Sequence, residues 1–143
     1  MHNFKVVAVA AVLALVAAAC GGTSATTVPA AGSPTVVHVT ANEMTVTSDV
    51  TTFKVGVPYT FEVTNEGTLP HEVMRVQPTD LTDMEEIDAF ALGMAESEDL
   101  VPGATVSFDY TFTEEDLAGP LELACHVPGH YEAGMLLPIT VEA

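Results

Sequence analysis

Apolar and polar residues alternate through Thr105-Val-Ser-Phe-Asp-Tyr-Thr-Phe112, which is the period of a strand that buries one face. The same alternation recurs in Thr35–Thr40, Met44–Thr47 and Tyr59–Val63, and apolar-rich runs occupy Leu121–Cys125 and Leu136–Val141. Turn residues separate these runs, as at Asn65-Glu-Gly67, Val101-Pro-Gly103 and Ala118-Gly-Pro120. About seven short strands with this punctuation predict an all-β sandwich of two antiparallel sheets.

One segment departs from the strand pattern. Within 80–95, apolar residues recur near helical spacing, at Leu81, Met84, Ile87, Ala91 and Met94. Acidic residues crowd its first turns, where the helix dipole favours negative charge, and Thr82 with Glu85 fits a capping box. We expect one short helix inserted between strands, lying across one edge of the sandwich with its methionines facing the core.

The start of the chain has the form of an export signal. A short basic segment ending at Lys5 precedes the apolar run Val6–Ala19, which is too short to span a bilayer comfortably. We therefore expect residues 1–19 to be a signal peptide and the protein to be exported.

The end of this run, Val16-Ala-Ala-Ala19-Cys20-Gly-Gly, resembles a bacterial lipoprotein cleavage site, at which Cys20 becomes the lipidated amino terminus. Position 17 is Ala where such sites usually have Leu, and Ala17 with Ala19 also suits an ordinary signal peptidase. Two outcomes stay open. The protein is either a lipoprotein anchored in the cell membrane and facing the periplasm or exterior, or a soluble secreted protein.

Residues 20–34 are the predicted lipidated cysteine and a flexible tether. After Cys20 they are small, polar and interrupted by proline, with too little apolar surface to offset the entropy of ordering them. Residues 35–143 are expected to form a single domain, since no second block of strands follows a linker. We expect this domain to be a monomer.

The chain carries 20 acidic residues against three Lys and Arg, for a formal net charge of −17. This charge excludes nucleic acid from the expected partners. It favours a partner with a basic docking face by electrostatic steering, and it fits equally well a solvated surface that maintains solubility.

Cys20 and Cys125 are the two cysteines of the chain. Because Cys20 lies at the start of the tether, we expect no disulfide between them. An unpaired thiol in an exported domain calls for a reason such as metal ligation or burial.

The stretch Cys125-His-Val-Pro-Gly-His130-Tyr-Glu-Ala-Gly-Met135 places a thiolate, an imidazole and a thioether at five-residue intervals around a Pro-Gly turn. A strand end followed by a tight loop can aim all three groups at one point. His71 adds a second imidazole at the mouth of another strand. These four residues are the candidate metal ligands.

The chemistry of this donor set favours one copper ion. Thiolate and thioether suit Cu(I), imidazole accepts either oxidation state, and the four together give a geometry between those that Cu(I) and Cu(II) prefer. Zinc accepts Cys and two His with water, but Met135 is a poor fourth ligand for it.

The motif C-x4-H-x4-M with an upstream histidine resembles the cupredoxins, with the loop spacing of rusticyanin and auracyanin rather than the shorter loop of plastocyanin. The resemblance covers residues 35–143 and includes Val57–Asn65, which looks like the family's strand leading into the site. It implies a Greek-key β-sandwich, copper held by His71, Cys125, His130 and Met135, and transfer of single electrons to a redox partner protein.

Position 72 departs from the family pattern. In many cupredoxins an Asn or Ser after the first histidine ties the ligand loops together, whereas this chain has Glu72. A carboxylate there changes the groups that orient the ligands and tune the metal. The run His71-Glu72-Val73, with an acidic helix between it and the cysteine motif, also looks like periplasmic cupredoxins linked to copper tolerance. Copper sequestration is therefore the alternative to electron transfer.

The remaining candidates have plainer interpretations. His126 is expected to point away from the ligand side of its strand, His38 to be solvated in an edge-like strand, and Met74 to pack in the interior. Enzymatic activity is not expected, because related oxidases and nitrite reductases need further histidine clusters. A metal-free adhesion or scaffold sandwich is a third hypothesis, which an unpaired exported thiol fits poorly.

Overall fold

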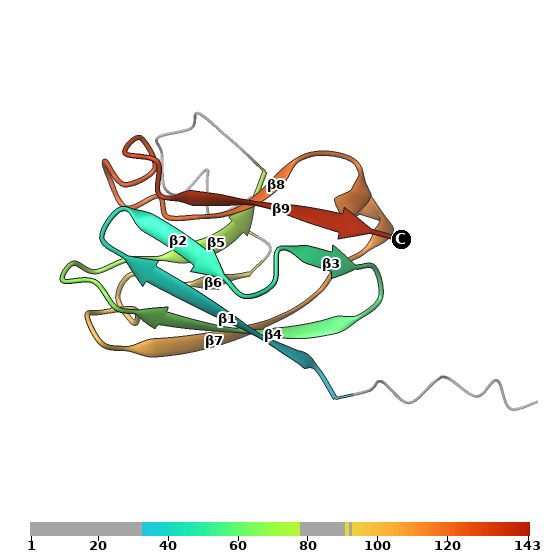
Figure 1. The fold of residues 1–143 in the computed structure, drawn as a ribbon, viewed down its shortest axis with the longest axis horizontal. Helices are drawn as coiled ribbons and strands as arrows, with labels where there is room; N and C mark the ends of the chain where they lie inside the picture. Colours follow the sequence, from blue (N-terminus) through green and yellow to red (C-terminus); the bar gives the residue numbers. More distant parts are fainter. Residues whose placement is uncertain (1–32, 78–90, 92) are drawn as a thin grey trace, which may run out of the picture.

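The computed structural model describes residues 33–77, 91 and 93–143 (Figure 1). The predicted signal peptide and most of the predicted tether, including Cys20, lie outside these residues, and their roles stay predictions. The described elements are β1 (Thr35–Asn42), β2 (Thr45–Ser48), β3 (Thr52–Lys54), β4 (Pro58–Asn65), β5 (Val73–Val76), β6 (Met94–Ala95), β7 (Thr105–Thr111), the 3-10 helix η1 (Glu114–Leu117), β8 (Leu121–Ala124) and β9 (Leu136–Glu142). Among these residues, no helix is long and apolar enough to cross a membrane.

The strands form two sheets, which confirms the predicted all-β sandwich. One sheet has the order β2-β1-β4-β7 and the other the order β3-β9-β8-β5-β6. In Figure 1, β1, β4 and β7 run together below, and β8 and β9 lie above them. The prediction of purely antiparallel sheets was wrong, because β1 pairs with β4 and β3 pairs with β9 in parallel. The chain crosses to the second sheet at β3 before it returns as β4, so β4 can lie beside β1 in the same direction.

The core lies between the two sheets. Burial alternates along β1 and β4, so that Val37, Val39, Phe61 and Val63 are fully or almost fully buried while their neighbours face outward. Aromatic contacts join the sheets: the Phe53 ring of β3 stacks on Phe112 at 4.8 Å and meets Phe61 of β4 at 5.5 Å between centroids. Burial of each such ring stabilises the fold by about 2–3 kcal/mol, which makes this cluster a main source of cohesion between the sheets.

Two strands were not expected from periodicity, and one segment was assigned wrongly. β3 and β5 are too short for alternation to stand out. The predicted helix at 80–95 falls mostly on residues 78–90 and 92, outside the described part of the chain. Its end, Met94–Ala95, is a strand that pairs with Val73 and Met74 of β5, so the helix prediction was wrong there. Gly93, directly before β6, lies against β7, because a Cβ at that position would be 2.8 Å from the Phe108 ring.

A buried ion pair also ties the sheets together. The Arg75 guanidinium of β5 lies 2.9 Å from the carboxylate of Asp116 in η1, and both side chains are almost completely buried. The guanidinium carbon sits 4.4 Å from the centre of the Tyr110 ring of β7. Asp116 accepts further hydrogen bonds from the Tyr110 hydroxyl and the Thr113 backbone N–H. Each member therefore depends on the others for compensation of its buried polar groups.

Asp116→Asn is expected to destabilise the protein by about 3–5 kcal/mol, because it leaves the Arg75 guanidinium buried without a counter-charge. Urea unfolding followed by circular dichroism measures the change. Glu115→Gln is the control, since Glu115 is the exposed neighbour in the same 3-10 helix. Equal stability of the two variants would contradict a structural role for the ion pair.

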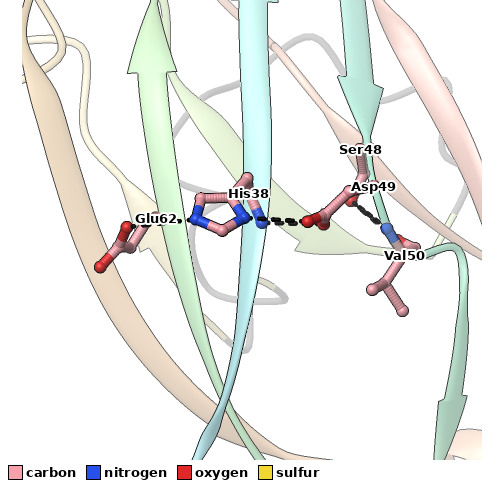
Figure 2. A network of polar contacts seen from close by, with 5 residues as sticks. All are labelled: His38, Ser48, Asp49, Val50 and Glu62. Atoms are coloured by element: carbon pink, nitrogen blue, oxygen red, sulfur yellow. Dashed lines mark hydrogen bonds and ion pairs between the residues drawn. The ribbon is translucent and has the colours of Figure 1, made fainter.

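His38 lies on the outer face of β1, within the network drawn in Figure 2. β1 is an internal strand between β2 and β4, so its interpretation as edge-like was wrong, whereas the exposure of His38 is confirmed at 67% for the side chain. The His38 Nδ1 lies 2.9 Å from Asp49, and its Nε2 lies 3.7 Å from Glu62. The hydrogen bond to Asp49 raises the pKa of His38 above 6.5, and the same bond lowers the pKa of Asp49 below 3.8.

These shifts define a pH window for the contact. The ionised Asp49 carboxylate stabilises the folded protein through this contact above pH 3.8, and this stabilisation is lost as the pH falls through the lowered pKa of the carboxyl. The protonated His38 ring stabilises the folded protein through the same contact below pH 6.5, and this stabilisation is lost as the pH rises through the raised pKa of the ring. In an NMR titration, Asp49→Asn is expected to bring the pKa of His38 down toward 6.5. An unchanged His38 titration in this variant would contradict the assigned cause.

Candidate metal centre

The pairing of β5 with β8 brings two candidate ligands to one end of the second sheet. These strands are antiparallel, with Met74 opposite Ala124. His71 comes just before β5 begins, and Cys125 comes just after β8 ends. Because the start of one antiparallel strand lies beside the end of its neighbour, the two side chains reach the same place.

The loop between β8 and β9 supplies the third group. The turn from Val127 to His130 is closed by the His130 N–H, which donates to the Val127 carbonyl at 2.9 Å. Pro128 and Gly129 occupy its centre, and Gly129 has a φ of +88°, a conformation that glycine adopts without strain. The Pro-Gly turn noted in the sequence therefore folds His130 back toward Cys125.

The donor atoms of His71, Cys125 and His130 all lie within 4.8 Å of one another. The Nδ1 atoms of the two histidines are 3.2 Å apart, and the Cys125 sulfur lies 3.5 Å from the His130 Nδ1. His71 and Cys125 are fully buried, and His130 is 7% exposed. Three donors of the types predicted for copper thus lie close enough together to bind one metal ion, and a thiolate with two imidazoles is a donor set that suits copper.

Met135 is held beside this cluster by its backbone. The Cys125 N–H donates to the Met135 carbonyl at 3.0 Å, and the Met135 N–H donates to the His130 carbonyl at 3.0 Å. The side chain is fully buried in the same core cluster as Cys125. This placement agrees with the predicted role of Met135 as the fourth ligand, and ligation by the Met135 sulfur stays a prediction.

Burial sets the protonation of the donors. It raises the pKa of the Cys125 thiol to about 11, although the backbone N–H groups of Glu72 and Val127 act in the opposite direction. Burial is also the main cause that lowers the pKa of His71, and the nearby His130 adds to it. Neutral imidazole is the ligand form, whereas the thiol has to lose its proton, so metal binding here is coupled to proton release.

The loop that carries His71 is fixed by Asn65 at the end of β4. The buried Asn65 amide donates to the carbonyls of Leu69 and Leu100 at 2.8 and 2.9 Å, and its oxygen accepts from the Gly67 N–H at 2.8 Å. Gly67 lies directly against the candidate ligand His71, because a Cβ there would be 2.9 Å from the His71 Nε2. The sequence indicated a glycine turn but not this contact, which depends on how the loop folds back.

One face of the site opens to solvent. A pocket of about 360 Å³ is lined by His130, Glu72 and apolar residues that include Leu69, Val127 and Pro128. Leu69 is 41% exposed at the edge of this pocket. The His130 ring is therefore the donor nearest to the surface.

The other histidine and methionine candidates lie outside the cluster. His126 is 5% exposed, and its ring stacks on Tyr131 with centroids 4.3 Å apart. Met74 is fully buried in a small cluster with Ala124, which confirms its interpretation as a packing residue. The Tyr131 hydroxyl donates to the buried Glu122 carboxylate at 2.7 Å, a contact that no sequence pattern indicated.

Sequence comparison gives a partial match. No protein-family model matches the chain. A segment of 41 residues is 46% identical to the copper-resistant cuproprotein CopI of Pseudomonas aeruginosa, and it covers 29% of this chain and 21% of that protein. The match thus spans about a fifth of the length of CopI.

Structural comparison gives matches over most of the chain. Reduced auracyanin from Roseiflexus castenholzii superposes with a TM-score of 0.58 at 20% identity, covering 78% of this chain and all of that one. The azurin Az-iso2 of Methylomonas sp. strain J gives 0.56 at 15% identity, covering 76% and 98%. Reduced rusticyanin gives 0.57 at 14% identity, covering 75% and 76%. This chain therefore has the cupredoxin fold, and its cluster of His71, Cys125 and His130 is consistent with a blue copper site.

Proposed function

We propose that this protein binds one copper ion as a type 1 centre outside the cytoplasm and passes single electrons to and from it. The observation that carries the proposal is the convergence of a buried thiol and two imidazoles within 4.8 Å. His71, Cys125, His130 and Met135 would hold the ion. Bound copper would supply a one-electron couple between Cu(I) and Cu(II).

The chain's own residues serve this function through rigidity and burial. Asn65 holds the loop of His71, and the hydrogen bonds between Cys125, Met135 and His130 hold the second loop. Because these hydrogen bonds hold both loops, the donor atoms would move little when the copper changes its oxidation state. Burial of His71 and Cys125 keeps water from the thiolate.

The exposed edge of the site suits contact with a redox partner. His130 lines the open pocket among apolar side chains, so a partner that docks there comes close to a ligand. The net charge of −17 supports a partner with a basic docking face. We further propose a monomer tethered to the membrane through lipidated Cys20 and facing the periplasm or exterior, on the basis of the residues around Cys20.

Copper sequestration is the second candidate function. It is favoured by the 41-residue match to a copper-resistant cuproprotein. The same four ligands would then retain copper rather than exchange electrons. The candidates differ in a deletion strain: loss of a copper-holding protein makes the cells copper-sensitive with normal respiration, whereas loss of an electron carrier impairs respiration at ordinary copper levels.

Copper-loaded wild-type protein is expected to show intense blue absorption and the narrow electron paramagnetic resonance pattern of a type 1 centre. Cys125→Ser is expected to abolish the blue band and weaken copper binding, because a hydroxyl replaces the soft thiolate. Cys20→Ser is the control, since it removes the other cysteine of the chain and leaves the predicted ligands intact. A colourless wild type with Cu(II), or a Cys125→Ser variant that binds copper as tightly, would contradict the proposal.

Gly67→Ala tests the placement of His71. The added Cβ would lie 2.9 Å from the His71 Nε2 and from the Glu43 backbone nitrogen, so the ring has to shift. Copper affinity is expected to fall roughly 10- to 100-fold, in line with other changes to groups that orient ligands. Competition with a chelator measures this loss. Gly119→Ala is the matched control, because a Cβ there meets nothing closer than the Gln77 side chain at 3.8 Å. Equal copper affinity of the two variants argues against His71 as a ligand.

A further inference from the structure

Glu72 joins the two ligand-bearing segments of the site. It follows His71 directly and is 6% exposed. Its carboxylate Oε1 accepts a hydrogen bond of 2.8 Å from the His126 backbone N–H, next to Cys125. Its own backbone N–H bonds to the Cys125 thiol group. One residue therefore connects the His71 loop to the Cys125 loop through both its side chain and its main chain.

The carboxylate also brings negative charge to the centre. Its Coulombic effect reaches the Cys125 sulfur, where it opposes formation of the thiolate. Because Glu72 is 6% exposed, this charge acts in a buried setting, where Coulomb interactions are stronger than in water.

We propose that Glu72 is a positioning residue: its carboxylate ties the ligand loops together, as an Asn or Ser does at this position in many cupredoxins, and in addition biases the site toward Cu(II). This inference rests on the proposed copper centre. A buried carboxylate close to the donors stabilises the more positive oxidation state of a bound metal, because the attraction grows with the charge of the ion. The Glu72 carboxylate thus lowers the reduction potential relative to a neutral side chain that makes the same hydrogen bond.

This bias bears on the choice between the two candidate functions. A site that favours Cu(II) accepts electrons less readily and holds the oxidised ion more firmly. The hydrogen bond from the His126 N–H to Glu72 also favours retention of copper, because it resists separation of the two ligand loops. Glu72 therefore moves the chemistry of a blue copper site toward copper retention.

Glu72→Gln separates the charge from the hydrogen bond, since the amide has nearly the same shape and keeps an oxygen acceptor. In redox titrations it is expected to raise the ratio of Cu(I) to Cu(II) at a fixed potential roughly tenfold, equivalent to about 59 mV for a one-electron couple. Glu72→Ala removes both the charge and the hydrogen bond to the His126 N–H. It is expected to shift the ratio in the same direction and to speed hydrogen exchange of the His126 amide in copper-free protein.

Two controls remove a carboxylate elsewhere. Glu62→Gln makes the same charge change on the exposed face of β4, where the side chain is 43% exposed. Glu122→Gln replaces a buried carboxylate in β8, which accepts a hydrogen bond from the Tyr131 hydroxyl, by an amide. Both are expected to leave the Cu(I) to Cu(II) ratio close to wild type, and Glu62→Gln is also expected to leave the His126 amide exchange unchanged.

The outcomes separate this inference from the proposed function. A blue Glu72→Gln protein with an unchanged or lowered ratio overturns the bias toward Cu(II) and leaves the copper centre standing. A shift as large in Glu122→Gln overturns the special role of Glu72. Unchanged hydrogen exchange of the His126 amide in Glu72→Ala contradicts the role of Glu72 in holding the two loops together. This test does not depend on copper. A wild-type protein that takes up no copper overturns the proposed function, and the bias with it.

Discussion

The antiparallel pairing of β5 with β8 is the constraint on which the candidate site depends. It places His71, two residues before β5, beside Cys125, directly after β8, although the two are 54 positions apart in the sequence. β9 pairs with β8 on its other side, with Ala124 opposite Leu136. The loop from Cys125 to Met135 therefore begins and ends at the same point of the sheet. The remaining donors have little freedom to lie elsewhere.

Buried polar groups hold the sandwich in register around this point. Arg75 leaves β5 on the side of the core and pairs with Asp116, which links the second sheet to the end of β7. Asn65 at the end of β4 hydrogen-bonds to two carbonyls of neighbouring loops. Such groups are costly to bury unless they are bonded, so they permit few alternative arrangements of the sheets. The ligand end and the opposite layer are in this way fixed relative to each other.

The two candidate functions use one frame and differ in what surrounds the metal. Electron exchange benefits from the rigid donors and from the edge of His130 in an open pocket. Retention benefits from a deep thiolate and from a carboxylate beside it. The cupredoxin fold serves either use, because the fold positions the ligands and the neighbouring residues tune them. In the proposed site, Glu72 is therefore the residue whose substitution best tells the two candidate functions apart.

Much of the chemistry could be predicted from the sequence because it is local. Alternation of period two identified most of the long strands, and the spacing of Cys125, His130 and Met135 indicated a soft-metal loop. The types of donor atom need no coordinates. The sequence also sufficed for the hypothesis that His71 completes the set, and the structure brings it into the cluster.

The sequence could not predict features that arise from contacts between distant segments. The parallel pairing of β1 with β4 depends on the path of the chain between the sheets, and Met94–Ala95 became a strand because β5 offered an edge to pair with. The contact of Gly67 with His71 and the bond from His126 to Glu72 likewise need loops folded against each other. Local pattern thus determined which groups the chain carries and the kind of sandwich they belong to. Only tertiary structure decided which groups touch, because contact energies across a core override local propensity.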